Sequence, residues 1–430
     1  MGSYEKKIWV STIYGRPDGA YFPYTPEKIF GKNLILSPAT INAISIATGA
    51  LATLESSGAV LTATEPLARL LLRSEAIASS QIEGLSVNSK KLMEREALTE
   101  LNVSQRIDST EASVLANIHV MHESVSSVCA GDVITLEDLQ EINRGVLAGT
   151  NMEREGGKVR MQQNWIGGSS CDPVGAAYVP PVPEKVPELL EDLFDFINDV
   201  RVPVLARAAL GHAQFESIHP FADGNGRTGR ALMLMILRFG GVVSRTIPPI
   251  SLSIASDKQR YLSILNAYRS EQPLEETGVM DELVAYFCQR CLDACGLATV
   301  FEKRMELLVE DWRVRAHVRA NSAASELMRL LPGNPVVSIQ SVARLTGRSR
   351  EAARNAINSL VAVGILTQNA RNKKSNLYTA DEVLSEFTTL ERAGATPGHD
   401  TAHGAPAKPV AQRAERPSVA GMPRYADVLD

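Results

Sequence analysis

Between His219 and Arg230 the chain reads HPFADGNGRTGR, which places a histidine, an acid and two arginines around a Gly-Asn-Gly turn. We expect a helix over residues 205–218 that Pro220 ends, because the residue before a proline is pushed out of helical geometry. His219 then lies at a helix end, where its ring can accept a proton from an attacking hydroxyl. The glycine turn opens a second helix, and a helix N-terminus with unobstructed backbone N–H groups binds anions.

The charged side chains of this stretch extend the predicted anion site. Arg227 and Arg230 are three residues apart, so they are neighbours on the first turn of the helix and can bind more than one phosphate. Asp223, just before the turn, is suited to hold Mg²⁺, the ion that accompanies di- and triphosphates. Together these groups favour attack of a hydroxyl on a phosphate of a nucleotide.

The same stretch resembles the signature of the Fic family, His-Pro-Phe-x-(Asp/Glu)-Gly-Asn-Gly-Arg-x-x-Arg, and every fixed position is present. QNWIGG (163–168) and YVPPVP (178–183) resemble the target-docking flap of that family and the segment behind it. The resemblance covers residues 20–380. It implies a mainly α fold: a Fic-type helical core with a β-hairpin flap.

The resemblance also implies an activity, the transfer of AMP from ATP to a Tyr, Thr or Ser hydroxyl of a target protein and of the chain itself. His219 would be the base and Asp223 the Mg²⁺ ligand. The related Doc kinases carry lysine at the position of Gly226, so this glycine favours nucleotidyl transfer over phosphorylation. The implied ATP-binding residues are Gly224, Asn225, Gly226, Arg227, Thr228, Gly229, Arg230 and Glu83. The implied target-docking residues of the flap are Trp165, Ile166 and Gly167.

A second motif, SSQIEG at 79–84, reads by itself as the end of a helix. It resembles the inhibitory motif of the family, (Ser/Thr)-x-x-x-Glu-(Gly/Asn), with Ser79, Glu83 and Gly84 at the required places. The resemblance implies that Glu83 pairs with Arg230 and turns ATP into a poor geometry for attack. An alternative is removal of AMP from modified proteins, with Glu83 positioning a water.

Residues 336–380 change character and indicate a small winged helix-turn-helix. Ser338 and Ser349 are placed to cap two short helices, the first ending at Gly347, with short strands at 365–367 and 376–378. The segment has seven Lys or Arg residues and one Glu, so its net charge is +6. The residues that could meet DNA phosphates are Arg348, Arg350, Arg354, Arg371, Lys373 and Lys374. A DNA-binding regulator with a nucleotide-sensing core is therefore a second alternative, and a regulatory or dimerisation module is a third.

Hydrophobic periodicity predicts the rest of the chain as helical, with one extended segment at 150–183 rich in Gly and Pro. The helical stretches are 36–56, 66–82, 108–126, 136–147, 184–217, 226–239, 257–270 and 275–312. We divide the chain into an N-terminal helical region with the inhibitory helix (1–107), a Fic core (108–300), a linker helix with the winged helix (301–390) and a disordered tail (391–430).

Composition limits the remaining possibilities. The chain has 430 residues, a formal net charge of −5 and five cysteines, too few for a disulfide framework. No apolar run follows the N-terminal lysines, and the run at 231–237 stops at Arg238, so we expect neither a secretory signal nor a membrane span. A cytoplasmic protein is the expectation, with a homodimer open. The weaker metal candidates, Cys288, Cys291, Cys295, His119 and His122, read better as packing or surface residues.

Overall fold

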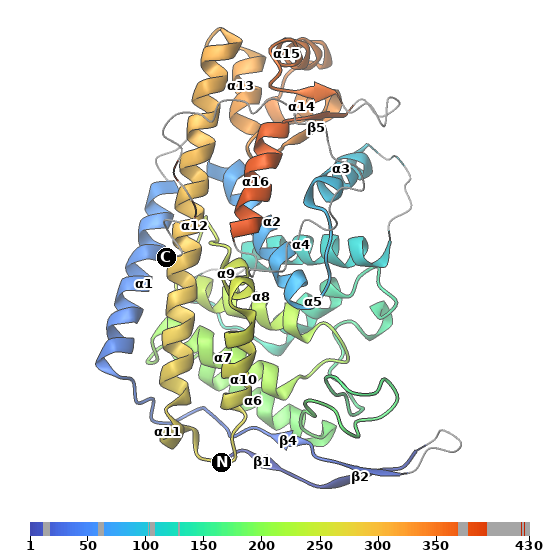
Figure 1. Cartoon of the computed structure of the whole chain (residues 1–430), viewed down its shortest axis with the longest axis vertical. Coiled ribbons are helices and arrows are strands. Elements are labelled where there is room, and N and C mark those ends of the chain that lie inside the picture. The colour runs from blue at the N-terminus through green and yellow to red at the C-terminus, as the bar shows by residue number, and fades with distance from the viewer. Residues whose placement is uncertain are drawn as a thin grey trace. The chain divides into compact units, whose positions relative to one another are not determined.

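The computed structural model describes residues 1–11, 18–58, 64–101, 103, 108–127, 130–368, 377–393, 423 and 425. Helices dominate it, with a few short strands (Figure 1), so the predicted mainly α fold class is confirmed. Contacts divide the chain into two compact units. The first unit holds Met1–Ala52, Ala116–Ser244 and Asp257–Leu292; the second holds Thr53–Leu115, Arg245–Ser256 and Asp293–Asp430. Each unit is made of several separate stretches of the chain, whereas the predicted domains are consecutive stretches. The predicted domain boundaries stay a prediction.

The first unit is built around two helices, α7 (Val204–Ile218) and α8 (Asn225–Phe239). From Leu205 to Ile218 every residue of α7 is buried, including polar Gln214. The two helices approach closely because Gly229 has no side chain: a Cβ there would lie 2.8 Å from a ring carbon of Phe215. The short loop between α7 and α8 carries the predicted catalytic motif, so the packing of these helices positions it.

Other helices surround this pair within the first unit. They are α5 (Leu136–Val146), α6 (Val186–Ile197), α10 (Lys258–Tyr268) and α11 (Leu274–Thr277), with 3-10 turns at Glu153–Glu155 and Pro183–Lys185. The helical stretch expected at 184–217 is divided, because a turn at Asn198 and Pro203 separates α6 from α7. Three helices run from one unit into the other: α1 (Pro38–Gly58), α4 (Ser109–Ser127) and α12 (Val279–Ala316).

The N-terminus forms a two-stranded ribbon that the sequence did not predict. Strands β1 (Ser3–Tyr4) and β4 (Tyr24–Thr25) pair antiparallel, as do β2 (Lys7–Trp9) and β3 (Gly19–Tyr21), with Ser3 opposite Thr25 and Lys7 opposite Tyr21. Tyr24 is 1% exposed and donates its hydroxyl to the Ser270 carbonyl at 2.9 Å. The aromatic segment around Tyr24 therefore packs on the helical body of the first unit.

The second unit contains α2 (Thr64–Ile82), α3 (Ser89–Glu100), α9 (Ile250–Ser256), α13 (Ala323–Leu330) and α16 (Asp381–Ala393). Its C-terminal part holds α14 (Ile339–Thr346), α15 (Arg350–Ala362) and an antiparallel sheet of β5 (Val336–Ser338), β7 (Leu377–Thr379) and β6 (Thr367–Gln368), in that order.

The predicted helix caps in this C-terminal part are confirmed. Ser338 accepts from the backbone of Ser341, Ser349 caps α15, and Gly347 is left-handed at φ 63°. The winged-helix identity stays a prediction. The wing residues Arg371, Lys373 and Lys374 lie outside the described residues, as does most of the predicted tail.

Helix α12 passes the length and hydropathy limits for crossing a membrane, which the sequence analysis did not expect of any segment. Of its most apolar window 61% is buried inside the protein. Cys288, Cys291 and Cys295 lie on this helix and are buried. Burial raises the pKa of Cys288 and of Cys295 to about 12, so these thiols are packing groups.

Candidate active site

His219 is the residue that ends α7, and its backbone is left-handed, with φ 51° and ψ 60°. Its N–H donates to the Phe215 carbonyl at 2.8 Å, which closes the helix. The following Pro220 keeps His219 out of helical geometry, as predicted. Few residues other than glycine adopt this conformation, which costs about 1–2 kcal/mol, so the surroundings must hold it.

The turn between His219 and α8 is tied together by Asn225. Its amide oxygen accepts from the Phe221 N–H at 2.9 Å, and its amide nitrogen donates to the Phe221 carbonyl at 2.8 Å. Gly224, with φ 76°, is the N-cap of α8. Both polar atoms of the Asn225 side chain are thus hydrogen-bonded within the turn. The group of Asn225 that can bind an anion is its backbone N–H at the start of α8.

Asn143 on α5 braces this turn from behind and was not predicted. It is fully buried; its amide nitrogen donates to the Asp223 carbonyl at 2.9 Å and to the Thr228 hydroxyl at 3.2 Å. Its amide oxygen accepts from the Gly157 N–H at 3.0 Å. One side chain therefore joins three segments: α5, the catalytic turn and the chain leading to the flap.

The two arginines predicted to bind phosphates are buried. Arg227 is 4% exposed and Arg230 is 1% exposed, so neither side chain lies on a solvated face of α8. Arg227 donates to the Val146 carbonyl on α5 at 3.3 Å. Buried guanidinium groups at a helix N-terminus favour an anionic ligand, because the helix dipole and the side chains add their positive potentials.

Asp223 is exposed at the start of the turn, and its Oδ1 accepts from the Gly224 N–H at 2.7 Å. Across the part of the chain that the structure describes, no group of three or more His, Cys, Asp or Glu side chains is placed to hold a metal. A single carboxylate fits Mg²⁺ when the nucleotide phosphates and waters supply the remaining oxygens.

The predicted flap is a minimal hairpin rather than a pair of regular strands. Ile166 and Tyr178 face each other and exchange backbone hydrogen bonds at 2.8 and 3.2 Å. Gly167 turns the chain with φ 73°, and Ile166 remains 39% exposed. The Trp165 ring meets Trp9 of the N-terminal ribbon edge-on, with centroids 5.7 Å apart. The flap thus has an accessible tip and a supported base.

Two side chains, that of Arg160 before the flap and that of Asn164 within it, reach the loop between α7 and α8; the sequence analysis gave neither a role. The Asn164 amide donates to the Phe221 carbonyl at 2.9 Å and to the His219 carbonyl at 3.4 Å. Arg160 donates from Nε to the His219 carbonyl at 2.9 Å. The only signal in the sequence was the polarity of these residues within an otherwise Gly- and Pro-rich segment.

The predicted inhibitory segment ends α2 in the second unit. Ser79 is fully buried, the helix ends at Ile82, and Gly84 is left-handed at φ 81°, as predicted for a residue that ends a helix. Glu83 belongs to this unit, whereas Arg230 belongs to the first. Their pairing stays a prediction.

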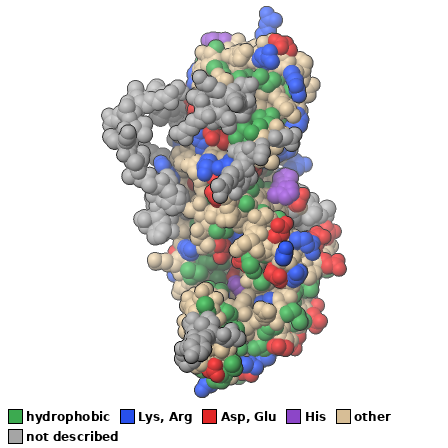
Figure 2. Space-filling view, turned by 90° about the vertical axis from the view of Figure 1, so that its right-hand side faces the viewer, with side chains coloured by type: hydrophobic (Ala, Val, Ile, Leu, Met, Phe, Trp, Pro, Cys, Tyr) green, Lys and Arg blue, Asp and Glu red, His purple; other side chains and the backbone are tan. Residues whose placement is uncertain are grey.

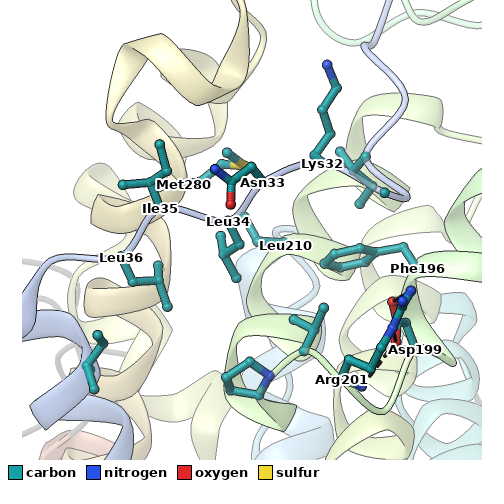
Figure 3. A pocket seen from close by; sticks show the side chains of 15 residues that line it. Lys32, Asn33, Leu34, Ile35, Leu36, Phe196, Asp199, Arg201, Leu210 and Met280 are labelled. Carbon is teal, nitrogen blue, oxygen red and sulfur yellow. Dashed lines mark hydrogen bonds and ion pairs between the residues drawn. The ribbon is translucent and has the colours of Figure 1, made fainter.

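A groove of about 830 Å³ opens elsewhere in the first unit (Figure 3). Residues 29–36 run along one side, and the turn between α6 and α7 forms the other, where Asp199 and Arg201 are ion-paired at 2.7 Å. Its lining is mostly apolar, with Phe196 and Leu210 at the centre. No residue of the catalytic motif lines it, so it is separate from the candidate active site.

Two family models and several known proteins match parts of the chain. The Fic/DOC family model matches residues 133–237, and the Fic/DOC family N-terminal model matches residues 41–124. The chain is 32% identical to protein adenylyltransferase fic-1 of Caenorhabditis elegans over 136 residues, 31% of this chain and 24% of that protein. It is 30% identical to protein adenylyltransferase Fic of Aedes aegypti over 165 residues, 37% of this chain and 31% of that protein.

The matched stretch thus spans about a quarter to a third of the length of these curated relatives. Among solved structures, a Fic family protein from Desulfovibrio desulfuricans matches with a TM-score of 0.49 and 20% identity. The match covers 82% of this chain and 98% of that one.

Proposed function

Because the chain belongs to the Fic/DOC family, we propose that it transfers AMP from ATP to a hydroxyl side chain of a target protein, with pyrophosphate leaving. The observation that carries the proposal is the loop between α7 and α8. It begins with a left-handed His219 and reaches α8 at a left-handed Gly224, so a base and an anion site share one short, braced segment. Both are held by backbone geometry, which limits their relative movement.

Each residue of the loop has a defined part in the proposed reaction. The oxygen of the target hydroxyl attacks the α-phosphorus, and the His219 imidazole accepts the proton of that hydroxyl. Backbone N–H groups at Asn225 and Gly226, in the first turn of α8 and at its positive end, stabilise the charge of the α-phosphate. Arg227 and Arg230 bind the β- and γ-phosphates, which become the pyrophosphate. The product is a phosphodiester between AMP and the target.

Mg²⁺ completes the proposal, held by Asp223 and the phosphates. When bound, the ion neutralises charge on the departing pyrophosphate. The carboxylate is exposed and near the turn that is proposed to bind phosphate, so it can reach an ion that enters with ATP. The flap, through Ile166 and Gly167, is proposed to dock the target mainly by its backbone, which leaves open whether Tyr, Thr or Ser is modified.

We further propose that Glu83 restrains the reaction by pairing with Arg230, in competition with the γ-phosphate. The supporting observation is local: Glu83 lies in a tight turn at the end of α2, fixed by the left-handed Gly84. A small shift of the α-phosphate from its attack geometry is enough to reduce the rate by orders of magnitude.

The charged side chains of the C-terminal part favour the DNA-binding alternative less than the transferase. Arg344 pairs with Glu100 at 2.7 Å, and Arg348 lies 3.4 Å from Glu326. The Arg354 guanidinium is 3.8 Å from a carboxylate of its own helix. Figure 2 shows one face of the molecule with acidic and basic side chains interspersed. Phosphate binding would have to displace these carboxylates, so we favour the transferase over the regulator.

The test is incubation of the purified chain with labelled ATP and Mg²⁺, alone and with cell lysate, followed by mass spectrometry of the modified proteins. We expect AMP on hydroxyl side chains with the parent chain. His219→Ala should abolish the label while ATP binding, measured by calorimetry, persists, because the phosphate-binding arginines remain. Label at the parent level in His219→Ala would exclude His219 as the base. Loss of AMP from pre-modified proteins, without transfer, would favour the de-AMPylating alternative.

A further inference from the structure

Arg160 is a buried cation at the entrance of the flap, and it is 5% exposed. Its guanidinium donates to backbone carbonyls on both sides of the flap and at the end of α7. The acceptors are His219 at 2.9 Å, Pro181 at 2.5 Å, Gln162 at 3.3 Å and Ile218 at 3.4 Å. Its backbone N–H also donates to the Pro220 carbonyl at 2.9 Å. A single residue therefore contacts the peptide units on both sides of the His219–Pro220 bond.

The charge of Arg160 is balanced by these carbonyls. The partners of its guanidinium within the described ranges are these carbonyls and no carboxylate, and burial lowers its pKa to about 10, so it remains charged at neutral pH. Two of its acceptors, Ile218 and His219, stand at the C-terminal end of α7, where the helix dipole is negative. The position thus stabilises the cation, and the cation in turn stabilises this helix end.

The conformation of His219 needs such support. A left-handed residue that is not glycine is disfavoured by about 1–2 kcal/mol and persists only where several contacts fix it. Arg160 fixes the His219 carbonyl with its side chain and the Pro220 carbonyl with its backbone. The Asn164 amide adds a second, longer contact to the His219 carbonyl.

We propose that Arg160 is a positioning residue for the reaction: through the carbonyls of His219 and Pro220 it holds the histidine in its left-handed conformation and couples it to the flap. The same guanidinium reaches Gln162 and Pro181, on the two arms of the flap. A target that docks on the flap therefore meets a base whose position depends on the same side chain. The proposal rests on the proposed role of His219 as the base.

The experiment compares Arg160→Met and Arg160→Lys with a matched control, Arg207→Met. Arg207 lies on the first turn of α7, is 4% exposed and donates to the Ile197 carbonyl at 3.0 Å, and burial lowers its pKa as well. Both methionine variants therefore remove a buried guanidinium that donates to backbone carbonyls. Only one of them touches the catalytic loop.

We expect Arg160→Met to lower kcat for AMP transfer by about 100-fold, the effect of a misplacement on the order of 1 Å. The KM for ATP should stay unchanged, because the guanidinium of Arg160 donates to carbonyls of the flap and of the end of α7, not to the residues proposed to bind phosphate. Arg160→Lys should recover part of kcat, since an ammonium keeps the charge but lacks the planar set of donors. Arg207→Met should keep the parent kcat, whatever stability it loses.

A second readout does not need activity: amide hydrogen exchange of His219 and Phe221, with the remaining peptides of α7 and α8 as the folding control. Exchange at both amides should be faster in Arg160→Met and unchanged in Arg207→Met. A parent kcat in Arg160→Met, or unchanged exchange at His219, would overturn the proposal. Should the parent transfer no AMP, the proposed function fails and exchange alone decides on Arg160. Should Arg160→Met not fold, Arg160→Lys is judged by the same criteria against Arg207→Lys.

Discussion

The replacement Gly224→Ala tests how the catalytic turn is seated on α5. Gly224 has φ 76°, and a Cβ there would lie 3.0 Å from Cγ1 of Val146, 3.2 Å from Nδ2 of Asn143 and 3.4 Å from Cδ2 of Leu147. The left-handed backbone costs an alanine about 1–2 kcal/mol. Crowding against α5 adds about 1 kcal/mol, the low end for overpacking, because side-chain atoms can give by a few tenths of an ångström. We expect a total loss of about 2–3 kcal/mol in local stability.

Gly278→Ala is the matched control. Gly278 directly precedes α12, belongs to the same unit and has φ 69°, but nothing lies within 4 Å of its Cβ position. Its alanine variant should lose only the backbone part, about 1–2 kcal/mol. The difference between the stability losses of the two variants measures the cost of crowding against α5. AMP transfer should fall by about 100-fold in Gly224→Ala, because the turn shifts relative to His219. It should be unchanged in Gly278→Ala.

Hydrogen exchange of peptides from α5 and α8, and from α11 and the start of α12, measures the local opening free energies. Incorporation of labelled AMP measures the reaction in the same preparations. Equal stability losses in the two variants would show that α5 does not press on the turn. Parent-level transfer in Gly224→Ala would show that the turn need not be seated as the structure has it, which would refute the geometric argument for the anion site.

Three further outcomes are expected. Asp223→Ala should weaken the dependence of turnover on Mg²⁺; a titration identical to that of the parent would exclude Asp223 as the ligand. Glu83→Gly should raise AMP incorporation by more than tenfold, since tenfold needs only ~1.4 kcal/mol of the barrier and Arg230 becomes available to the γ-phosphate; unchanged incorporation would rule out the brake. Burial raises the pKa of Glu391 from 4.5 to about 7, with Ser89 as its hydrogen-bond partner at 2.5 Å. Between these pH values Glu391 therefore binds more protons in the folded state than in the unfolded state. The free energy of unfolding of the second unit should fall as pH rises from about 4.5 to 7, by up to about 3 kcal/mol. Glu391→Gln should remove this loss in hydrogen exchange of α16, and a parent-like pH dependence would contradict the assignment.

Local features were predictable because neighbouring residues decide them. Ser338 and Ser349 cap helices with their own side chains, and Gly84 ends α2 in the left-handed region that glycine tolerates. Pro220 forces His219 out of α7 whatever the rest of the chain does. The short strands of the N-terminal ribbon were missed, since only two or three residues pair at a time and no periodicity develops over so short a run.

The sequence by itself therefore determined the inventory of the candidate site: the motif from His219 to Arg230, the order of its groups and the helix ends that carry them. Tertiary structure alone decided what holds those groups in place. Arg160 reaches the His219 carbonyl across 59 residues of chain, and Asn143 reaches the Asp223 carbonyl across 80. The physical reason is that a hydrogen bond to a backbone carbonyl requires only a donor at the right point in space. Any residue type supplies that carbonyl, so no pattern of side chains along the chain announces it.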